Sequence, residues 1–281
     1  MASRLKWIIL LPIINFFAAL ALFLTLLLLW ITSGHPRYKS NEATVVYISD
    51  VGAVNKPLFI GLGTTISVFY VSTLSIDYLL RRKKKLQPMV RRKAEKPIAL
   101  LSILFSVVAA VGLICLTIFD AFNHSTMHWT FAAIFFVGLA ISGALNVTEI
   151  GLLHKDHPKS NQLRWSFRAK LIIIILAVIS LILMAVLMGV CSKSPDKYNA
   201  EGQMSQSCNI EDSLSAVFEW AIAFLFSFYL ATLVLDMLPY RLAMEDDISF
   251  DDENDSGHAN NSTSTSNSNS NSNMAQVHSP V

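Results

Sequence analysis

Charge is the property that this sequence has least of. Only 15% of its 281 residues are Asp, Glu, Lys or Arg and 53% are hydrophobic, whereas about a quarter of the residues of a soluble domain are charged. The net charge of +2 provides no broadly basic surface for a nucleic acid. These values exclude a water-soluble enzyme built around one compact core, and they argue against a nucleic-acid partner.

Recognisable catalytic and cofactor motifs are also missing. The chain has three cysteines, too few for a secreted disulfide scaffold. It contains no P-loop, no dinucleotide glycine fingerprint and no nucleophile elbow, and its histidines and acids follow no known metal-ligand spacing. We therefore expect no catalytic residues, no metal and no cofactor, and a protein that is not an enzyme.

The sequence does contain long apolar runs. Each is close to the roughly 20 residues that cross a bilayer core of about 30 Å, and none alternates with the period of two of a membrane barrel strand. The six runs are residues 7–31, 58–80, 97–119, 129–153, 171–191 and 214–238. They predict an all-α fold, a polytopic membrane helical bundle of six transmembrane helices within residues 1–243.

Basic residues are distributed unevenly between these runs. All but five of the 22 Lys and Arg residues lie before the first run, in the second and fourth loops, or after the last run; the exceptions are Arg37, Lys39, Lys56, Lys193 and Lys197. Because loops rich in Lys and Arg remain in the cytoplasm, both termini and the loop at residues 81–96 are predicted to be cytoplasmic.

The composition changes again near the end of the chain. An acidic stretch at residues 245–255 is followed by a run at 260–273 built almost wholly of Asn and Ser. Such a segment cannot bury enough apolar area to offset the entropy lost on ordering. Residues 244–281 are therefore predicted to form a disordered cytoplasmic tail.

The loop after the second run carries two dense basic clusters. Clusters of this kind, just cytoplasmic of a helix, are typical of contact with anionic lipid, but they also serve as topology signals. Both interpretations are open at this point. The candidate lipid-contacting residues are Arg81, Arg82, Lys83, Lys84, Lys85, Arg91, Arg92 and Lys93.

Acidic residues inside the apolar runs need an explanation, because a charge in the bilayer is costly. Asp77, Glu149 and Asp236 lie near the predicted cytoplasmic ends of their runs, where structural ion pairs with Lys or Arg are expected. Ser142, Asn146 and Glu149 are spaced i, i+4 and i+7. They predict a polar stripe that forms hydrogen bonds between helices.

Another polar group is expected at the outer leaflet. Glu219 lies about five residues into the last run with no basic residue close before it, and Asp50 and His128 are predicted at a similar depth. Structural hydrogen bonding is the expected role of this cluster, and a catalytic site is the open alternative. Cys191 and Cys208 flank one outer loop, where a disulfide is plausible in an oxidising compartment.

Several segments resemble a known family. They are Tyr47–Asp50 followed by Gly52, Pro57 and Phe59; His128 with Phe135 and Phe136; and Ser215–Asp236. Together these segments resemble the DRAM-type six-span membrane proteins, and the similarity covers all six runs in order. That family includes lysosomal autophagy modulators, GPI-anchor lipid-remodelling factors and fungal suppressor-of-four-kinase proteins of the plasma membrane. The Asn/Ser-rich tail favours the fungal group.

The resemblance implies a function as well as a fold. It implies a non-enzymatic plasma-membrane organiser that supports recruitment of a phosphatidylinositol 4-kinase complex and the organisation of membrane lipids, with anionic phosphoinositides as partners. One alternative is a GPI-anchor or ceramide remodelling factor of the Golgi or ER, with Asp50, His128 and Glu219 as its site. Another is an autophagy modulator of the vacuole or lysosome. The resemblance carries over no catalytic residues.

Overall fold

Long helices make up nearly all of the computed structural model, which describes residues 6–39, 42–89, 92–194, 198 and 204–261; for residues 6, 7, 92 and 239–261 it describes the backbone alone. A short 3-10 helix, η1, spans Lys6–Ile9. The α-helices are α2 (Leu10–Thr32), α3 (Ile48–Val54), α4 (Lys56–Arg82), α5 (Arg92–Ile118), α6 (Ser125–Asp156), α7 (Asn161–Lys193) and α8 (Gln206–Asn261). Within these ranges the only extended pairing is an isolated bridge between Tyr198 and Met204.

Six of the helices are long and apolar enough to cross a membrane, which confirms the predicted all-α bundle. The candidate spans are Leu10–Thr32, Lys56–Arg82, Lys93–Ile118, Ser125–Asp156, Asn161–Lys193 and Gln206–Leu238. Most extend past the predicted apolar runs at one or both ends. Hydropathy marks only the part of a helix that suits hydrocarbon, whereas the helical hydrogen bonds continue into the polar flanks.

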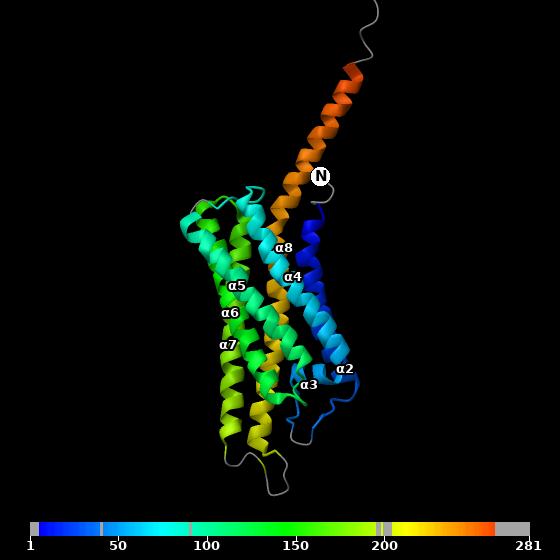
Figure 1. Cartoon of the computed structure of the whole chain (residues 1–281), viewed down its shortest axis with the longest axis vertical. Helices are drawn as coiled ribbons and strands as arrows, with labels where there is room; N and C mark the ends of the chain where they lie inside the picture. Colours follow the sequence, from blue (N-terminus) through cyan, green and yellow to red (C-terminus); the bar gives the residue numbers. More distant parts are fainter. Residues whose placement is uncertain (1–5, 40–41, 90–91, 195–197, 199–203, 262–281) are drawn as a thin grey trace, which may run out of the picture. The chain divides into compact units, whose positions relative to one another are not determined.

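The spanning helices run side by side, and the chain reverses direction at each turn (Figure 1). The short helix α3 lies at the end of the bundle opposite η1. The loop segment at residues 83–89 and the turn at 157–160 lie at the same end as η1. This alternation places the basic loop and the segment around α3 at opposite ends of the bundle.

Helices α5 and α6 approach one another closely because small residues line their contact. A Cβ atom added to Gly112 would lie 2.7 Å from the backbone nitrogen of Phe135, and one added to Gly138 would lie 3.0 Å from the backbone nitrogen of Ala109. Small residues allow such close packing between membrane helices. Gly61 differs, since a Cβ there would meet nothing within 4 Å.

The bundle has a buried core and one peripheral helix. The core lies among α2, α4 and α8 and includes Leu22, Leu26, Ile66, Tyr70 and Leu230. Only 11% of the most apolar window of α7 is buried, against 33–50% for the other spans. A helix that is apolar on all sides and mostly exposed is suited to contact with lipid.

The chain divides into two compact units, residues 1–241 and 242–281. In the second unit the backbone continues as part of α8 to Asn261. The predicted disorder of residues 244–281 remains a prediction, and residues 262–281 lie outside the described part of the chain.

Candidate functional site

The outer-leaflet cluster expected from the sequence is built around the start of α3. The Glu219 carboxylate, on α8, accepts a hydrogen bond of 2.7 Å from the backbone N–H of Ile48, the first residue of α3. The N–H groups of a first helical turn have no partners within the helix, and the helix dipole there favours a negative group. Glu219 therefore caps α3 from a distant part of the sequence.

His128 has a comparable role at the end of α5. Its Nδ1 atom lies 2.9 Å from the carbonyl oxygen of Phe119 and 3.0 Å from that of Leu116. Two carbonyl neighbours require that Nδ1 carry the proton and donate. His128 thus satisfies carbonyl groups that are left unpaired where α5 ends.

Glu219 and His128 line the same small cavity, whose other walls are mostly apolar side chains such as Phe59 and Phe226. The cavity volume is about 50 Å³, which is room for a few water molecules. No hydrogen bond joins Glu219 to His128 in the described structure; each binds backbone groups instead. The structure therefore brings these two predicted residues to one place and gives each a structural partner.

Asp50 lies beside this cavity, on α3, and is close enough to Glu219 for the two carboxyl groups to interact. Its side chain is buried. Burial and repulsion from Glu42 raise the pKa of the Asp50 carboxyl to about 7, although Lys39 and the Tyr47 N–H act in the opposite direction. Asp50 can therefore exchange a proton near neutral pH.

Asp120, at the same end of the bundle, has the opposite environment. Its Oδ2 lies 2.8 Å from the Lys56 Nζ, and its Oδ1 accepts hydrogen bonds from the backbone and side chain of Asn123. Burial would raise the pKa of Asp120, but the hydrogen bonds from Lys56 and Asn123 outweigh it and hold the pKa well below its usual range. Asp120 is thus a charged structural anchor for the turn after α5.

A second polar group lies inside the bundle, nearer the opposite end. Lys170 of α7 is fully buried and forms an ion pair with Asp236 of α8. Its Nζ also donates to the Asn146 side chain on α6 at 2.6 Å, and Tyr229 donates to the same Asn146 oxygen at 3.2 Å. These bonds join three helices through one buried cation, as an unpaired charge there would be costly.

The predicted polar stripe on α6 takes part in this group. Ser142 bonds to the Tyr70 hydroxyl at 3.0 Å and donates to the carbonyl oxygen of Ser102 at 2.9 Å. With Asn146, it forms the interhelical hydrogen bonds that the spacing predicts. Glu149 differs from the expectation: it is buried, but none of the ion pairs in the described structure includes it, and its Oε1 has no hydrogen-bond partner.

The basic loop separates into buried and exposed members. Arg81, one of the candidate lipid-contacting residues, is buried on the inward face of α4, and its Nε binds Asp77 at 2.7 Å. The side chains of Arg82, Lys83, Lys84, Lys85 and Lys93 are exposed. Arg91 and the side chain of Arg92 lie outside the described residues.

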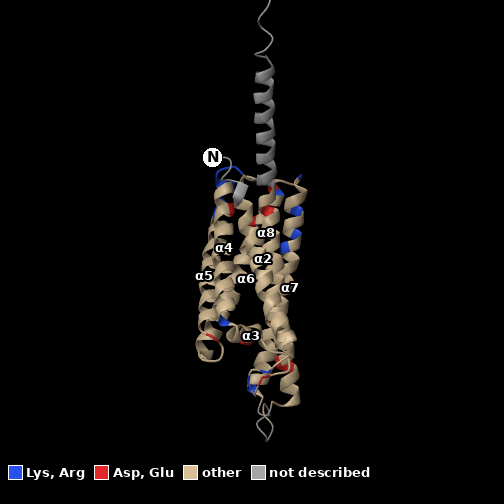
Figure 2. Ribbon diagram, turned by 90° about the vertical axis from the view of Figure 1, so that its right-hand side faces the viewer, with Lys and Arg blue, Asp and Glu red and all other residues tan. Residues whose placement is uncertain are grey.

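The exposed side chains of Arg82, Lys83, Lys84, Lys85 and Lys93 form a basic rim at one end of the bundle. Figure 2 shows Lys and Arg gathered where α4 ends and along the first part of α7, whereas the middle of the bundle is nearly free of charge. A basic rim beside an apolar slab is the arrangement that attracts anionic lipid headgroups.

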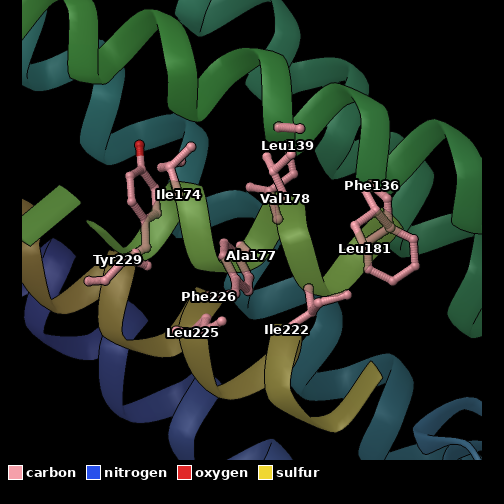
Figure 3. Close-up of a pocket in the computed structure, with 12 residues that line it drawn as sticks. Phe136, Leu139, Ile174, Ala177, Val178, Leu181, Ile222, Leu225, Phe226 and Tyr229 are labelled. Atoms are coloured by element: carbon pink, nitrogen blue, oxygen red, sulfur yellow. The ribbon is translucent and has the colours of Figure 1, made fainter. Parts of the chain in front are cut away.

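A further groove lies between α6, α7 and α8 (Figure 3). Its volume is about 50 Å³, and its walls include Phe136, Leu139, Ile174, Leu181 and Ile222. Tyr229 supplies the one hydroxyl group among the lining residues. The groove has no acid, base or nucleophile with which to act on a bound molecule.

The predicted cysteine pair lies on either side of the loop between α7 and α8. The structure joins Cys191 and Cys208 in a disulfide, with their Cα atoms 5.0 Å apart. Cys115, on α5, is free. The disulfide ties the end of α7 to the beginning of α8 across a loop whose residues 195–197 and 199–203 lie outside the described structure.

Comparison with known families decides the identity of this bundle. Residues 7–240 match the model of the Frag1/DRAM/Sfk1/Cwh43P N-terminal domain. The chain belongs to the Frag1/DRAM/Sfk1 family. The match covers all six candidate spans, which confirms the family suggested by the sequence resemblance.

Two fungal members of the Frag1/DRAM/Sfk1 family are similar to this chain. It is 32% identical over 231 residues to "Protein sfk1" of Schizosaccharomyces pombe, covering 82% of this chain and 64% of that protein. It is 25% identical over 181 residues to "Protein SFK1" of Saccharomyces cerevisiae, covering 54% of this chain and 51% of that protein. The chain thus spans less than two thirds of the length of these relatives. No solved structure matches.

In this Frag1/DRAM/Sfk1 family member, two of the segments that carry the resemblance lie against each other. Besides the bond from Ile48 to Glu219, the Trp220 indole donates to the carbonyl oxygen of Val46 at 3.1 Å. The Val45 N–H donates to the Ser213 hydroxyl at 3.2 Å. The segment before α3 is therefore fastened along α8, although the two are far apart in the sequence.

Lys170 is the residue that sequence reasoning missed. The charge pattern counts it as part of a cytoplasmic loop, but it lies on the inward face of α7, four residues after Ser166, which also binds Asp236. The i, i+4 spacing of Ser166 and Lys170 was the signal available, because it places both on one helical face.

Proposed function

We propose that this family member is a non-enzymatic organiser of the membrane that presents a basic surface to anionic lipid and supports recruitment of a phosphatidylinositol 4-kinase complex at the plasma membrane. The observation that carries this proposal is the exposed basic rim formed by Arg82, Lys83, Lys84, Lys85 and Lys93. Each such residue near an anionic leaflet contributes about 1 kcal/mol of attraction.

The topology is part of this proposal. With both termini in the cytoplasm, the rim faces the leaflet that carries the anionic lipids. The distribution of Lys and Arg over the loops supports this orientation. The role in kinase recruitment rests on the resemblance to the fungal plasma-membrane group, which the similarity to the two Sfk1 proteins supports.

The bonding of the buried polar residues supports a role without catalysis. Glu219 and His128 each bind backbone groups at helix ends, and Lys170 and Asp236 bind each other. A general base or nucleophile needs a free atom directed at a substrate site, and the cavity beside Glu219 has room only for water.

A second candidate is a remodelling factor for GPI-anchor or ceramide lipids acting from the outer leaflet. It is favoured by one observation: Glu219 and His128 line a single cavity and Asp50 lies beside it, which places acid and base groups at one depth. Under this alternative, Glu219→Gln would be abundant, correctly located and inactive.

The proposal is tested in cells with a tagged protein in which Arg82, Lys83, Lys84 and Lys85 are all replaced by Gln. We expect normal abundance and loss of most of the 4-kinase from the plasma membrane, measured by quantitative imaging. The matched control replaces four exposed basic residues elsewhere at the same end of the bundle, Lys155, Lys159, Arg164 and Arg168, by Gln.

Equal kinase recruitment in the loop variant and the wild type would reject the organiser role of the rim. An equal loss of kinase recruitment in the loop variant and in the control would show that the total positive charge at this end matters, and not the loop itself. A glycosylation-tag reporter in each variant checks that the second span has not inverted, since the loop is also a topology signal.

A further inference from the structure

A cavity lies at the basic end of the bundle, and most of the residues that line it do not belong to the basic rim. Its volume is about 310 Å³, at the lower end of the range for small-molecule pockets. Tyr78, Arg81 and Arg82 of α4, Pro88 and Met89 of the following loop, and Lys96 of α5 line it. Three of these six residues are basic, and none is acidic.

Arg81 forms the buried wall of this cavity and is only partly paired. Its side chain is 0% exposed, and only its Nε is bonded, to Asp77. The Nη1 and Nη2 atoms are buried and have no hydrogen-bond partner. Leaving such donors unsatisfied is unfavourable, and a ligand that accepts two hydrogen bonds would remove the penalty.

The pairing with Asp77 also fixes the direction of the guanidinium. The bond between Nε and the Asp77 carboxylate, four residues earlier on α4, holds the planar group in one orientation, and Nη1 and Nη2 are its unpaired donors. Paired guanidinium N–H donors match two oxygens of a phosphate group. Arg82 and Lys96 are exposed and place two further cations at the cavity mouth.

The loop wall is held in place by the bundle. Met89 is buried and packs in a cluster with Tyr78 and Leu153. The carbonyl oxygen of Pro88 lies 3.2 Å from the Nε2 of His157. The cavity is therefore bounded by side chains with fixed partners as well as by the exposed rim.

Nearby acids do not close the cavity to an anion. Asp77 is bonded to Arg81, and Glu149 and Asp236 also act on Arg81 electrostatically, but none of the three lines the cavity. An entering anion would meet the donors of Arg81 and the charges of Arg82 and Lys96.

We propose that this cavity binds the phosphomonoester of a membrane lipid headgroup, with Arg81 donating from the buried wall and Arg82 and Lys96 holding the phosphate at the mouth. This inference deepens the proposed function and rests on it for the cytoplasmic orientation of the cavity. A lipid is favoured over a free phosphate because the basic rim that surrounds the mouth also attracts an anionic leaflet.

The experiment titrates the full-length protein in detergent with phosphatidylinositol monophosphate and, separately, with phosphatidylserine and phosphatidylinositol. Bound lipid is counted by native mass spectrometry. We expect the monophosphate to bind at least tenfold more tightly than either of the other lipids. Equal affinity for the monophosphate and phosphatidylserine would overturn the proposal.

Two variants locate the binding. Arg81→Lys keeps a cation beside Asp77 but removes the forked pair of donors, and Arg82→Gln with Lys96→Gln removes the charges at the mouth. Each should weaken binding of the monophosphate at least tenfold. The control, Lys155→Gln with Lys159→Gln, removes two exposed charges that belong neither to the cavity lining nor to the basic rim and should change affinity less than threefold.

Equal losses in the mouth variant and the control would reject the cavity in favour of general surface attraction. If Arg81→Lys does not fold, the mouth variant still tests the proposal, because its two substitutions are at exposed positions. Soluble inositol monophosphate is added as a competitor: binding as tight as that of the lipid would overturn the choice of a lipid ligand.

The outcome is independent of kinase recruitment. Unchanged lipid binding in the cavity variants would end this inference and leave the organiser role untouched. Loss of recruitment in the loop variant is read in cells and concerns the proposed function alone.

Discussion

At the residue scale, two buried polar side chains, Glu219 and His128, provide partners for backbone groups at helix ends. Glu219 binds the first N–H of α3, and His128 binds the last carbonyl groups near the end of α5. A buried backbone group without a partner destabilises the fold by about 1–3 kcal/mol. These two residues therefore set where α3 and α5 lie relative to α8 and α6.

This role makes a direct prediction for Glu219. Glu219→Gln should retain an oxygen that accepts from Ile48, so its abundance and thermal stability should stay close to wild type. Glu219→Ala leaves the buried N–H unpaired and should lower the free energy of unfolding by about 1–3 kcal/mol. Fluorescence-detected size-exclusion chromatography after heating measures both. An Ala variant as stable as the wild type would contradict the capping role.

Asp50 should make stability depend on pH. The folded-state pKa of about 7 lies above the ordinary value of 3.8, so the folded protein holds a proton between these values that the unfolded chain releases. Stability from this group is therefore fully present below about pH 4 and is lost as the pH rises to about 7. The full loss is at most about 4 kcal/mol.

Asp50→Asn should remove this dependence. It should match the wild type near pH 4 and be the more stable protein at pH 8, measured by thermal unfolding in nanodiscs. Asp120→Asn is the contrasting variant, because a lowered pKa stabilises the fold at pH values above the ordinary value. It should be less stable than wild type at pH 8. An Asp50→Asn variant that is no more stable at pH 8 would contradict the assignment.

At the scale of the helices, two kinds of contact hold the bundle together. Close packing joins α5 to α6 through Gly112 and Gly138, and buried polar bonds join α7 to α6 and α8 through Lys170. Hydrophobic burial contributes little between helices that lipid already surrounds, so packing and hydrogen bonds determine their arrangement.

Gly112→Ala should separate α5 from α6. Its Cβ would lie 2.7 Å from a backbone nitrogen of Phe135, and a backbone contact cannot be relieved by turning a side chain. We expect a loss of about 1–3 kcal/mol, measured as a lower melting temperature in detergent. Gly61→Ala, with open space around the new Cβ, is the matched control and should be neutral. Equal effects of the two changes would contradict the close contact.

Lys170 and Asp236 should behave as a pair. Lys170→Met leaves the Asp236 carboxylate buried without its cation and should destabilise the protein by about 3–5 kcal/mol. Adding Asp236→Leu should recover much of that loss. Lys155→Met, at an exposed position, controls for loss of charge. Additive losses in the double variant, measured by thermal unfolding, would show that the two residues are not coupled.

At the scale of the whole molecule, residues 1–241 form an apolar bundle with a different polar surface at each end. One end carries the basic rim and the cavity around Arg81 (Figure 2). The other carries α3 and the structural carboxyl groups of Asp50, Asp120 and Glu219. This asymmetry is what an orientation in the membrane requires.

Cysteine labelling tests that orientation. In a background with Cys115→Ala, Gln87→Cys should react with a membrane-impermeant maleimide only after the cells are permeabilised. Val54→Cys, 52% exposed at the opposite end, should react in intact cells. The physical basis is the predominance of Lys and Arg at the end that contains Gln87. The reverse pattern would invert the proposed topology.

The sequence by itself determined the class of the fold and the six spans. Hydropathy is a local property: about 20 successive apolar residues must pair their backbone groups within one helix in a bilayer, whatever their neighbours. The family likeness also followed from the sequence, because its segments occur in order along the chain. The sequence also predicted that Asp77 and Asp236 form ion pairs with Lys or Arg, since a charge in the bilayer needs a partner. It did not identify the partner of either residue.

Only the tertiary structure decided which residues meet. Arg81 lies next to exposed cations in the sequence but turns inward to Asp77, and Lys170 lies at a loop boundary but reaches α8. Glu219 finds its partner in Ile48 and not in His128. These outcomes depend on the rotation of each helix about its axis and on contacts between distant segments. Spacing along one helix shows which residues share a face but not which residues on other helices they meet, so packing selects the partner of each buried charge.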